Sequence, residues 1–153
     1  MNALASPAER LVCDTSFVGT IARRSAHPDR FEHWPAAILD RIAGAILAIS
    51  VVTLAEARYG YLKAGWGQAR VAREEHRLAT FLQMPLDPTV LDEWARLKLS
   101  SRRNGWNVSD NDVWIAATAS ARGHALVTCD GDQARIADSG LEVLYLSQRD
   151  DSG

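Results

Sequence analysis

Two short apolar segments of this sequence each run directly into an aspartate. RLVCDTS contains Asp14 and LVTCDGD contains Asp130, while Glu56 lies in VTLAEARYG and both Asp110 and Asp112 lie in SDNDVWIAATAS. Carboxylate oxygens are the ligands that hard divalent cations such as Mg²⁺ or Mn²⁺ prefer in proteins. Histidine and cysteine, the ligands that zinc prefers, are missing from these positions, which argues against zinc. The chemistry that these residues could support is therefore metal-assisted hydrolysis.

Each acid also has an ordinary structural explanation. The segments TLAE (Thr53 to Glu56) and SDND (Ser109 to Asp112) fit capping boxes, and an aspartate directly after a strand can cap the following helix. Several acids at one sheet edge would repel one another, however, and such crowding raises carboxyl pKa values and opposes folding unless a cation is present. Taken together, the acids therefore favour a metal site, although spacing alone does not choose between Asp110 and Asp112.

Short apolar runs alternate with longer segments of helical spacing, which is typical of a parallel sheet covered by helices. The expected strands are Arg10 to Asp14, Ala45 to Ser50, Met84 to Leu86, Ala125 to Cys129 and Glu142 to Tyr145. The expected helices are 15–24, 29–43, 52–64, 67–82, 88–104, 110–122 and 131–138. In open sheets of this kind, ligands bind beyond the carboxyl ends of the strands, where these acids would meet.

Length and composition predict one α/β domain spanning residues 1–153, with a core from about 10 to 146 and short flexible ends. Hydrophobic residues make up 47% and charged residues 24%, as in ordinary globular proteins. The net charge of -2 disfavours a purely electrostatic nucleic-acid binder. Two cysteines, Cys13 and Cys129, form no disulfide framework, so buried free thiols are expected, with a disulfide between them as the alternative. The absence of a signal-like start and of a long apolar segment predicts a cytoplasmic protein without a membrane partner.

The segments VCDTS, TLAEARYG and SDNDVWIAATASARGHALVTCD, in this order, resemble the PIN-domain ribonucleases, in particular the toxins of bacterial VapBC-type toxin-antitoxin pairs. The resemblance covers roughly residues 10–145. Its most specific part is Asp-x-x-Ile-Ala-Ala-x-Ala, followed by glycine, a short strand and Thr-x-Asp. It implies a three-layer α/β/α sandwich around a parallel sheet of four to five strands.

The resemblance also implies roles for individual residues. The family's catalytic and metal-binding acids fall on Asp14, Glu56, Asp112 and Asp130. Supporting hydroxyls fall on Ser16 and Thr128, which leaves Asp110 and Asp132 as outer or capping residues. The implied cofactor is Mg²⁺, with Mn²⁺ plausible, and either one or two ions could bind. The implied partners are an RNA substrate, a cognate antitoxin and a second copy in a homodimer.

Basic and aromatic side chains are the candidates for holding RNA. Lys98, Arg102 and Arg103 have helical spacing before Asp112 and could contact phosphates. Trp106, like Trp66, lies next to a glycine and could stack on bases. A solvated helix face is the alternative for the basic residues.

Other functions remain open at this point. One alternative is a catalytically silent PIN-like module that only binds RNA or a protein, and another is a phosphatase or receiver-type domain. A metal-free ribonuclease would need paired histidines as acid and base. His27, His33, His76 and His124 share no obvious edge of the predicted fold, so this route is disfavoured.

Overall fold

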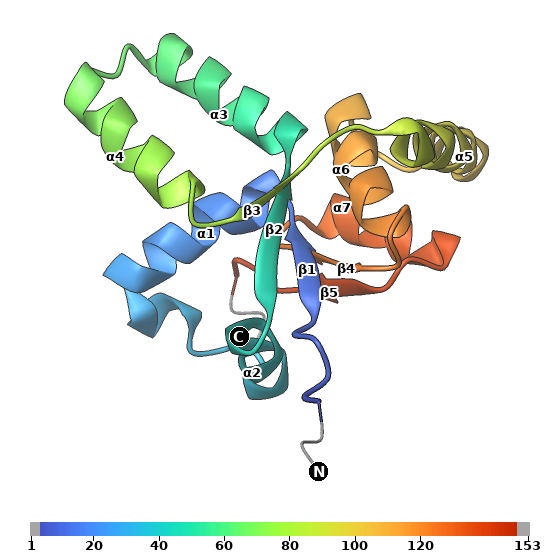
Figure 1. The fold of residues 1–153 in the computed structure, drawn as a ribbon, viewed down its shortest axis with the longest axis horizontal. Coiled ribbons are helices and arrows are strands. Elements are labelled where there is room, and N and C mark those ends of the chain that lie inside the picture. Colours follow the sequence, from blue (N-terminus) through green and yellow to red (C-terminus); the bar gives the residue numbers. More distant parts are fainter. Residues whose placement is uncertain (1–3, 150–153) are drawn as a thin grey trace.

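The computed structural model describes residues 4–149 and contains a five-stranded, all-parallel sheet with the order β3-β2-β1-β4-β5 (Figure 1). The strands are β1 (Arg10–Cys13), β2 (Ile46–Ser50), β3 (Leu82–Met84), β4 (Ala125–Thr128) and β5 (Val143–Tyr145). The order reverses at β1, which lies at the centre of the sheet between β2 and β4. Side chains that follow β1 and its two neighbours therefore come together at one edge.

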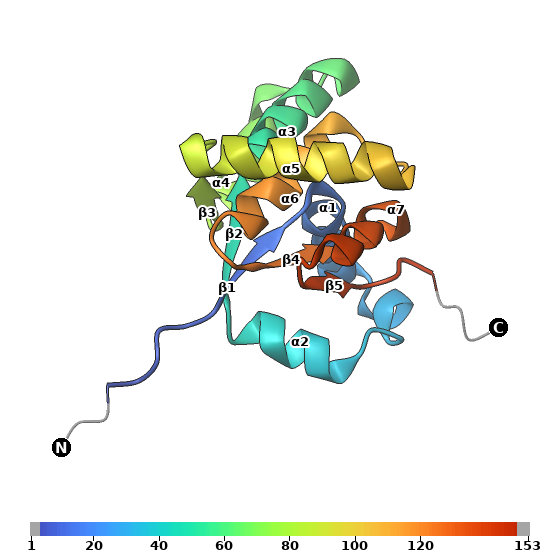
Figure 2. The same cartoon turned by 90° about the vertical axis from the view of Figure 1, so that its right-hand side faces the viewer.

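Helices cover both faces of the sheet, as the alternation of apolar side chains along the strands requires. In β1, Leu11 and Cys13 join one core cluster and Val12 joins the other. The first core lies beneath α1 and α2, and the second beneath α5 and α6. Figure 2 shows α5 crossing over α6, so that α6 is enclosed between the sheet and α5. The predicted three-layer α/β/α sandwich is confirmed.

The helical elements have the following bounds. The α-helices are α1 (Thr15–Ala26), α2 (Ala36–Ala43), α3 (Val51–Ala64), α4 (Gln68–Leu78), α5 (Pro88–Asn104), α6 (Asp110–Ser120) and α7 (Gly131–Ala134), and the 3₁₀ helices are η1 (Pro28–Phe31) and η2 (Arg135–Ser139). Helices α3 and α4 form a hairpin that extends away from the carboxyl end of β2 (Figure 1). Among residues 4–149, no helix is long and apolar enough to cross a membrane.

Four predicted elements differ from the structure. The expected helix 67–82 is α4, which ends at Leu78, and Leu82 already belongs to β3. The expected helix 29–43 is divided into η1 and α2, because Pro35 cannot donate a backbone hydrogen bond and disfavours helical backbone at the residue before it. The third strand lies two residues earlier than expected, since Pro85 interrupts the predicted Met84 to Leu86 segment and the ladder ends at Met84. The expected helix 131–138 becomes the short α7 followed by η2. Of the predicted flexible ends, residues 1–3 and 150–153 lie outside the described residues.

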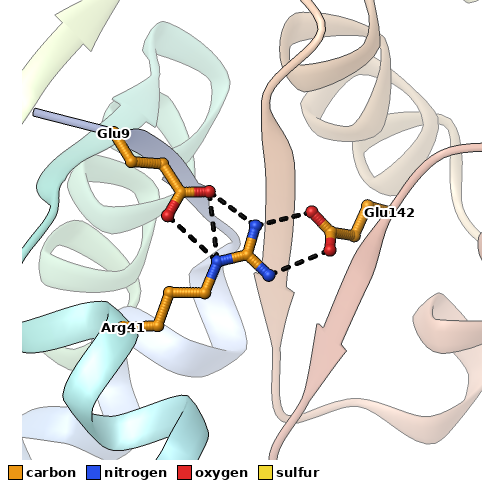
Figure 3. Close-up of polar contacts among 3 residues, drawn as sticks. All are labelled: Glu9, Arg41 and Glu142. Atoms are coloured by element: carbon orange, nitrogen blue, oxygen red, sulfur yellow. Dashed lines mark hydrogen bonds and ion pairs between the residues drawn. The ribbon is translucent and has the colours of Figure 1, made fainter. Parts of the chain in front are cut away.

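An arginine joins three segments at the amino edge of the sheet, opposite the acids. The guanidinium of Arg41 in α2 lies between Glu9, just before β1, and Glu142, just before β5 (Figure 3). Its Nη2 atom is 2.5 Å from Glu9 Oε1 and 2.6 Å from Glu142 Oε1. Hydrogen bonds from Arg41 lower the pKa of both glutamates, and the two carboxylates raise the pKa of Arg41.

Candidate active site

Asp14 directly follows β1, caps the start of α1 and is the most deeply buried of the predicted acids, with 3% exposure. Its Oδ1 atom accepts hydrogen bonds from Ser16 Oγ (2.7 Å) and from the backbone N-H of Phe17 (2.9 Å). The Thr128 hydroxyl donates to Oδ2 from the neighbouring strand β4. These donors fix the carboxyl group at the carboxyl edge of the central strand.

Burial is the main reason that the pKa of Asp14 is raised from 3.8 to about 6. The hydrogen bonds from Ser16, Thr128 and Phe17 act in the opposite direction, and the negative charge of Asp112 raises the pKa further. A group that carries an unfavourable negative charge in a buried place is suited to bind a cation.

Thr128 and Ser16 connect Asp14 to the end of β4. The Thr128 hydroxyl accepts a hydrogen bond from the backbone N-H of Asp130 (3.0 Å), and Ser16 Oγ accepts one from the N-H of Cys129 (3.0 Å). Asp130 itself is partly buried and caps α7. The supporting hydroxyls inferred from resemblance therefore do lie between the ends of β1 and β4.

Glu56 reaches the same region from α3. Its Oε1 atom accepts a hydrogen bond from Thr15 Oγ1 (2.7 Å), which also lies 3.1 Å from Thr53 Oγ1. The alternative explanation of Thr53 to Glu56 as a capping box is wrong, because α3 already begins at Val51 with Ser50 as its cap. Glu56 is thus not needed to start its helix. Thr15, the residue after Asp14, was not singled out from the sequence.

Asp112 does take part in the capping box expected at SDND. Its backbone N-H donates to Ser109 Oγ and its carboxylate accepts from the Ser109 N-H, both at 3.1 Å. Gln133 of α7 donates from Nε2 to the backbone oxygen of Asp112 (3.0 Å) and is fully buried, with no partner for Oε1 among the described residues. Sequence reasoning missed Gln133, since an isolated glutamine in a polar segment carries no local signal of burial.

The four acids lie on segments at the carboxyl ends of β1, β2 and β4 or at the start of α6, and each carboxylate is hydrogen-bonded to a residue outside the acid set. No three histidine, cysteine, aspartate or glutamate side chains within residues 4–149 are grouped closely enough to hold a metal ion as they stand. The donor set of Asp14, Glu56, Asp112 and Asp130 consists only of carboxylate oxygens, which suits Mg²⁺ or Mn²⁺. Chemically, the residues fit such an ion.

The four candidates for RNA binding, Lys98, Arg102, Arg103 and Trp106, differ in their exposure and in their contacts. Lys98 forms a 2.5 Å ion pair with Asp110, and Arg102 and Arg103 are exposed in the last turn of α5. Trp106 is partly buried and packs against the second core, which leaves less of its ring for stacking than its loop position suggested.

Trp66 already contacts two side chains of its own chain, contrary to the expected availability for bases. The Tyr61 ring stacks on it with a centroid distance of 5.2 Å, and the Arg70 guanidinium lies 3.8 Å from its centroid. Aromatic and cation-π contacts of this kind compete directly with a stacked base. A loop position beside glycine did not reveal these neighbours.

Cys13 is the last residue of β1, whereas Cys129 follows the end of the adjacent strand β4 instead of lying within it, and both thiols are free and buried. The disulfide alternative is therefore wrong. Burial raises the pKa of both thiols, that of Cys129 to about 12. Both behave as small apolar side chains beneath the acids.

Comparison with known proteins agrees with this arrangement. The PIN domain model matches residues 11–139, and the chain therefore belongs to the PIN-domain family. Ribonuclease VapC4 of Mycobacterium tuberculosis is 39% identical over 140 residues, which cover 90% of this chain and 97% of that protein. Ribonuclease VapC5 of the same organism is 37% identical over 92 residues, or 59% of this chain and 68% of that protein.

Solved structures show the same fold. A member of the VapBC family of toxin-antitoxin systems from Mycobacterium tuberculosis, VapBC-5, matches with a TM-score of 0.60 and 28% identity, over 92% of this chain and 99% of that chain. DNA-bound VapBC from Salmonella typhimurium matches with a TM-score of 0.70 and 21% identity, over 90% and 98% of the two chains. Membership of the PIN-domain family sets aside the phosphatase and receiver alternatives.

Proposed function

We propose that this protein is a toxin of the VapC type, a metal-dependent endoribonuclease that hydrolyses RNA phosphodiester bonds. The observation that supports the proposal is that Asp14 and Asp130 directly follow β1 and β4 in a PIN-domain chain, while Glu56 lies on the helix after β2 and Asp112 in the first turn of α6. Two relatives named as VapC ribonucleases support the same activity. We assign the four acids as the metal ligands and catalytic residues.

Asp14 is the fixed member of this proposed site. Its carboxyl group is buried and is oriented by Ser16 and Thr128, so it can present one constant position to a cation. Glu56, Asp112 and Asp130 are partly exposed and would turn from their present partners towards the ion. A bound Mg²⁺ or Mn²⁺ supplies charge stabilisation at the phosphate and makes water a better nucleophile.

Residues outside the set of four acids would hold the RNA substrate and the start of α6. The Lys98 ammonium neutralises Asp110 in the first turn of α6, beside Asp112. Arg102 and Arg103 are exposed and remain the proposed phosphate contacts, while Lys98 and Trp106 have a larger share in packing and ion pairing. Phosphate contacts of this kind make RNA binding weaker at high salt.

The proposed partner is a cognate antitoxin, since the structural relatives include toxin-antitoxin complexes. A cavity of about 410 Å³ between α3 and α4, lined mainly by apolar surface that includes Leu62, Trp66 and Val71, is a candidate contact for it. Tyr59 and Leu62 of α3 are exposed and available to such a partner, whereas Ile21, Leu39 and Tyr61 pack in or against the core. A homodimer is also proposed.

The activity can be tested by incubating the purified protein with total RNA and Mg²⁺ and mapping the new RNA ends. We expect cleavage that stops with EDTA and leaves a 5'-phosphate and a 3'-hydroxyl. Asp112→Asn should lower the rate by at least about a hundredfold, because it removes a charged ligand. Asp92→Asn, an exposed aspartate on α5, is the matched control and should cleave normally.

Two results would contradict the proposal. Products ending in a 2',3'-cyclic phosphate would exclude hydrolysis by water, because that product forms when the RNA 2'-hydroxyl attacks. Absence of cleavage with both Mg²⁺ and Mn²⁺ would favour the alternative of a catalytically silent module.

A further inference from the structure

A polar cavity of about 540 Å³ adjoins the proposed active site on the side of β5. One wall contains Ser16, Asp130 and Gly131, and the other contains Tyr145, Ser147 and Arg149. The cavity therefore shares Ser16 and Asp130 with the acidic edge. A molecule that occupied this cavity would therefore lie next to the Asp130 side of the proposed active site.

The register of the sheet places Tyr145 beside this cavity. It pairs with Thr128 across β4 and β5, while the residues on either side of it, Leu144 and Leu146, are buried in the core. The Tyr145 side chain is 42% exposed, and its hydroxyl lies against Gly131, where an added Cβ would come within 3.3 Å of it. Helix α7 and β5 lie next to each other in Figure 2. The aromatic ring is thus held beside the Asp130 loop with much of its surface open.

The segment after β5 is fixed by hydrogen bonds from several elements. Leu146 N-H continues the ladder by donating to Thr128 O (2.9 Å), and the backbone oxygen of Ser147 accepts from Trp34 Nε1 (2.7 Å). His33 Nε2 lies 2.8 Å from the same oxygen. This wall of the cavity is consequently ordered before any ligand arrives.

The side chains of this segment give the wall a basic and polar character. Ser147 Oγ accepts from Arg149 N-H (3.1 Å) and donates to Arg149 O (3.0 Å), which orients the backbone at Arg149. Arg23 of α1 donates to Gln148 Oε1 (3.0 Å), bringing a second guanidinium to the rim. An aromatic ring beside guanidinium groups is the combination that binds an unpaired nucleotide, through base stacking and phosphate contacts.

We propose that this cavity is a subsite for one unpaired nucleotide of the RNA strand next to the cleaved bond, with Tyr145 stacking on its base and Arg149 contacting phosphate. This inference rests on the proposed ribonuclease function and narrows its substrate class to RNA that is single-stranded at the cleavage position. A duplex keeps its bases stacked on one another and offers no free base face to Tyr145. The subsite therefore selects unpaired RNA.

Binding is measured in an Asp14→Asn background, which is expected not to cleave, by fluorescence anisotropy with a short fluorescein-labelled single-stranded RNA of mixed sequence. Tyr145→Ala should weaken binding about tenfold, within the range for loss of one stacked base, and Tyr145→Phe should retain it. Arg149→Gln should reduce the slope of log affinity against log salt by about 0.7, the contribution of one phosphate contact to a single strand. When the same RNA is annealed to its complement, the Tyr145→Ala, Tyr145→Phe and Arg149→Gln variants should all bind the duplex with equal affinity.

Tyr59→Ala and Arg73→Gln are the matched controls, since both side chains are exposed on the α3-α4 hairpin and do not line this cavity. Their affinity and salt slope should equal those of the parent. Unchanged affinity for Tyr145→Ala, or an equal loss with the duplex, would overturn the subsite. The anisotropy comparison does not require cleavage, whereas failure of the wild-type protein to cut RNA would overturn the proposed function alone.

Discussion

Replacing Asp14 with asparagine should make the metal-free protein more stable while it abolishes cleavage. The Asp14 carboxyl is 3% exposed, and burial together with the charge of Asp112 raises its pKa to about 6. Above that pH the folded protein must hold a buried negative charge, which the unfolded chain leaves in water. Asparagine has nearly the same shape but carries no charge.

The size and sign follow from proton linkage. The difference between 3.8 and about 6 corresponds to about 3 kcal/mol, at about 1.4 kcal/mol for each pKa unit. Because the folded state binds the proton more tightly than the unfolded state, stability falls as pH rises from about 4 to about 6 and stays reduced above. Asparagine forms weaker hydrogen bonds with Ser16 and Thr128, so the expected gain at neutral pH is about 1 to 3 kcal/mol.

The assay is thermal unfolding in EDTA, followed by circular dichroism across a pH series. Asp14→Asn should melt about 2 to 10 °C above the wild type at pH 7.5, and the gain should disappear near pH 4. Asp92→Asn, at an exposed position, should melt like the wild type throughout. Adding Mg²⁺ should narrow the difference, because only the wild type has the full set of charged ligands. Equal or lower stability of Asp14→Asn at pH 7.5, or a pH-independent difference, would refute the reasoning.

Two further predictions concern residues outside the acid set. Arg41→Met should lower the melting temperature by about 1 to 4 °C near neutral pH, since partly exposed ion pairs are weak. Arg41 lowers the pKa of Glu9 and Glu142, so this loss should vanish as pH falls through their folded pKa values and should shrink in high salt; a loss that persists at pH 3 would contradict it. Gln133→Met should leave stability nearly unchanged, because it removes a buried unpartnered oxygen along with one hydrogen bond, but it should slow RNA cleavage several-fold by releasing Asp112 O. Cleavage at the wild-type rate would show that Gln133 does not position Asp112.

Local sequence signals explain why much of the fold could be predicted. The alternation of Leu11, Val12 and Cys13 between two cores, and the aspartate that follows them, are properties of adjacent residues. Pro85 is a local signal of the same kind, because a proline has no N-H to donate to the ladder and β3 ends just before it. Positions at strand ends could therefore be assigned to one edge before any tertiary contact was known.

Contacts between distant segments could not be predicted in this way. Thr15 reaches Glu56 across 41 residues, and Arg41 reaches Glu142 across 101 residues. Whether Trp66 offers a free ring depends on Tyr61 and on the turn that brings Arg70 over it. Such pairings depend on how helices dock, and no pattern within one segment encodes them.

The burial of α6 links the interior of the protein to its chemistry. Residues such as Ile115 and Ala116 are fully enclosed between the sheet and α5, while Asp112 lies in the first turn of the same rigid helix. A methyl group added at Ala116 would push α6, and Asp112 with it, away from its present packing position, because a close-packed interior has no spare volume to absorb the added group. Cells that survive expression of the protein without an antitoxin should therefore include mutants in which an interior alanine is replaced by a larger residue while every acid is intact.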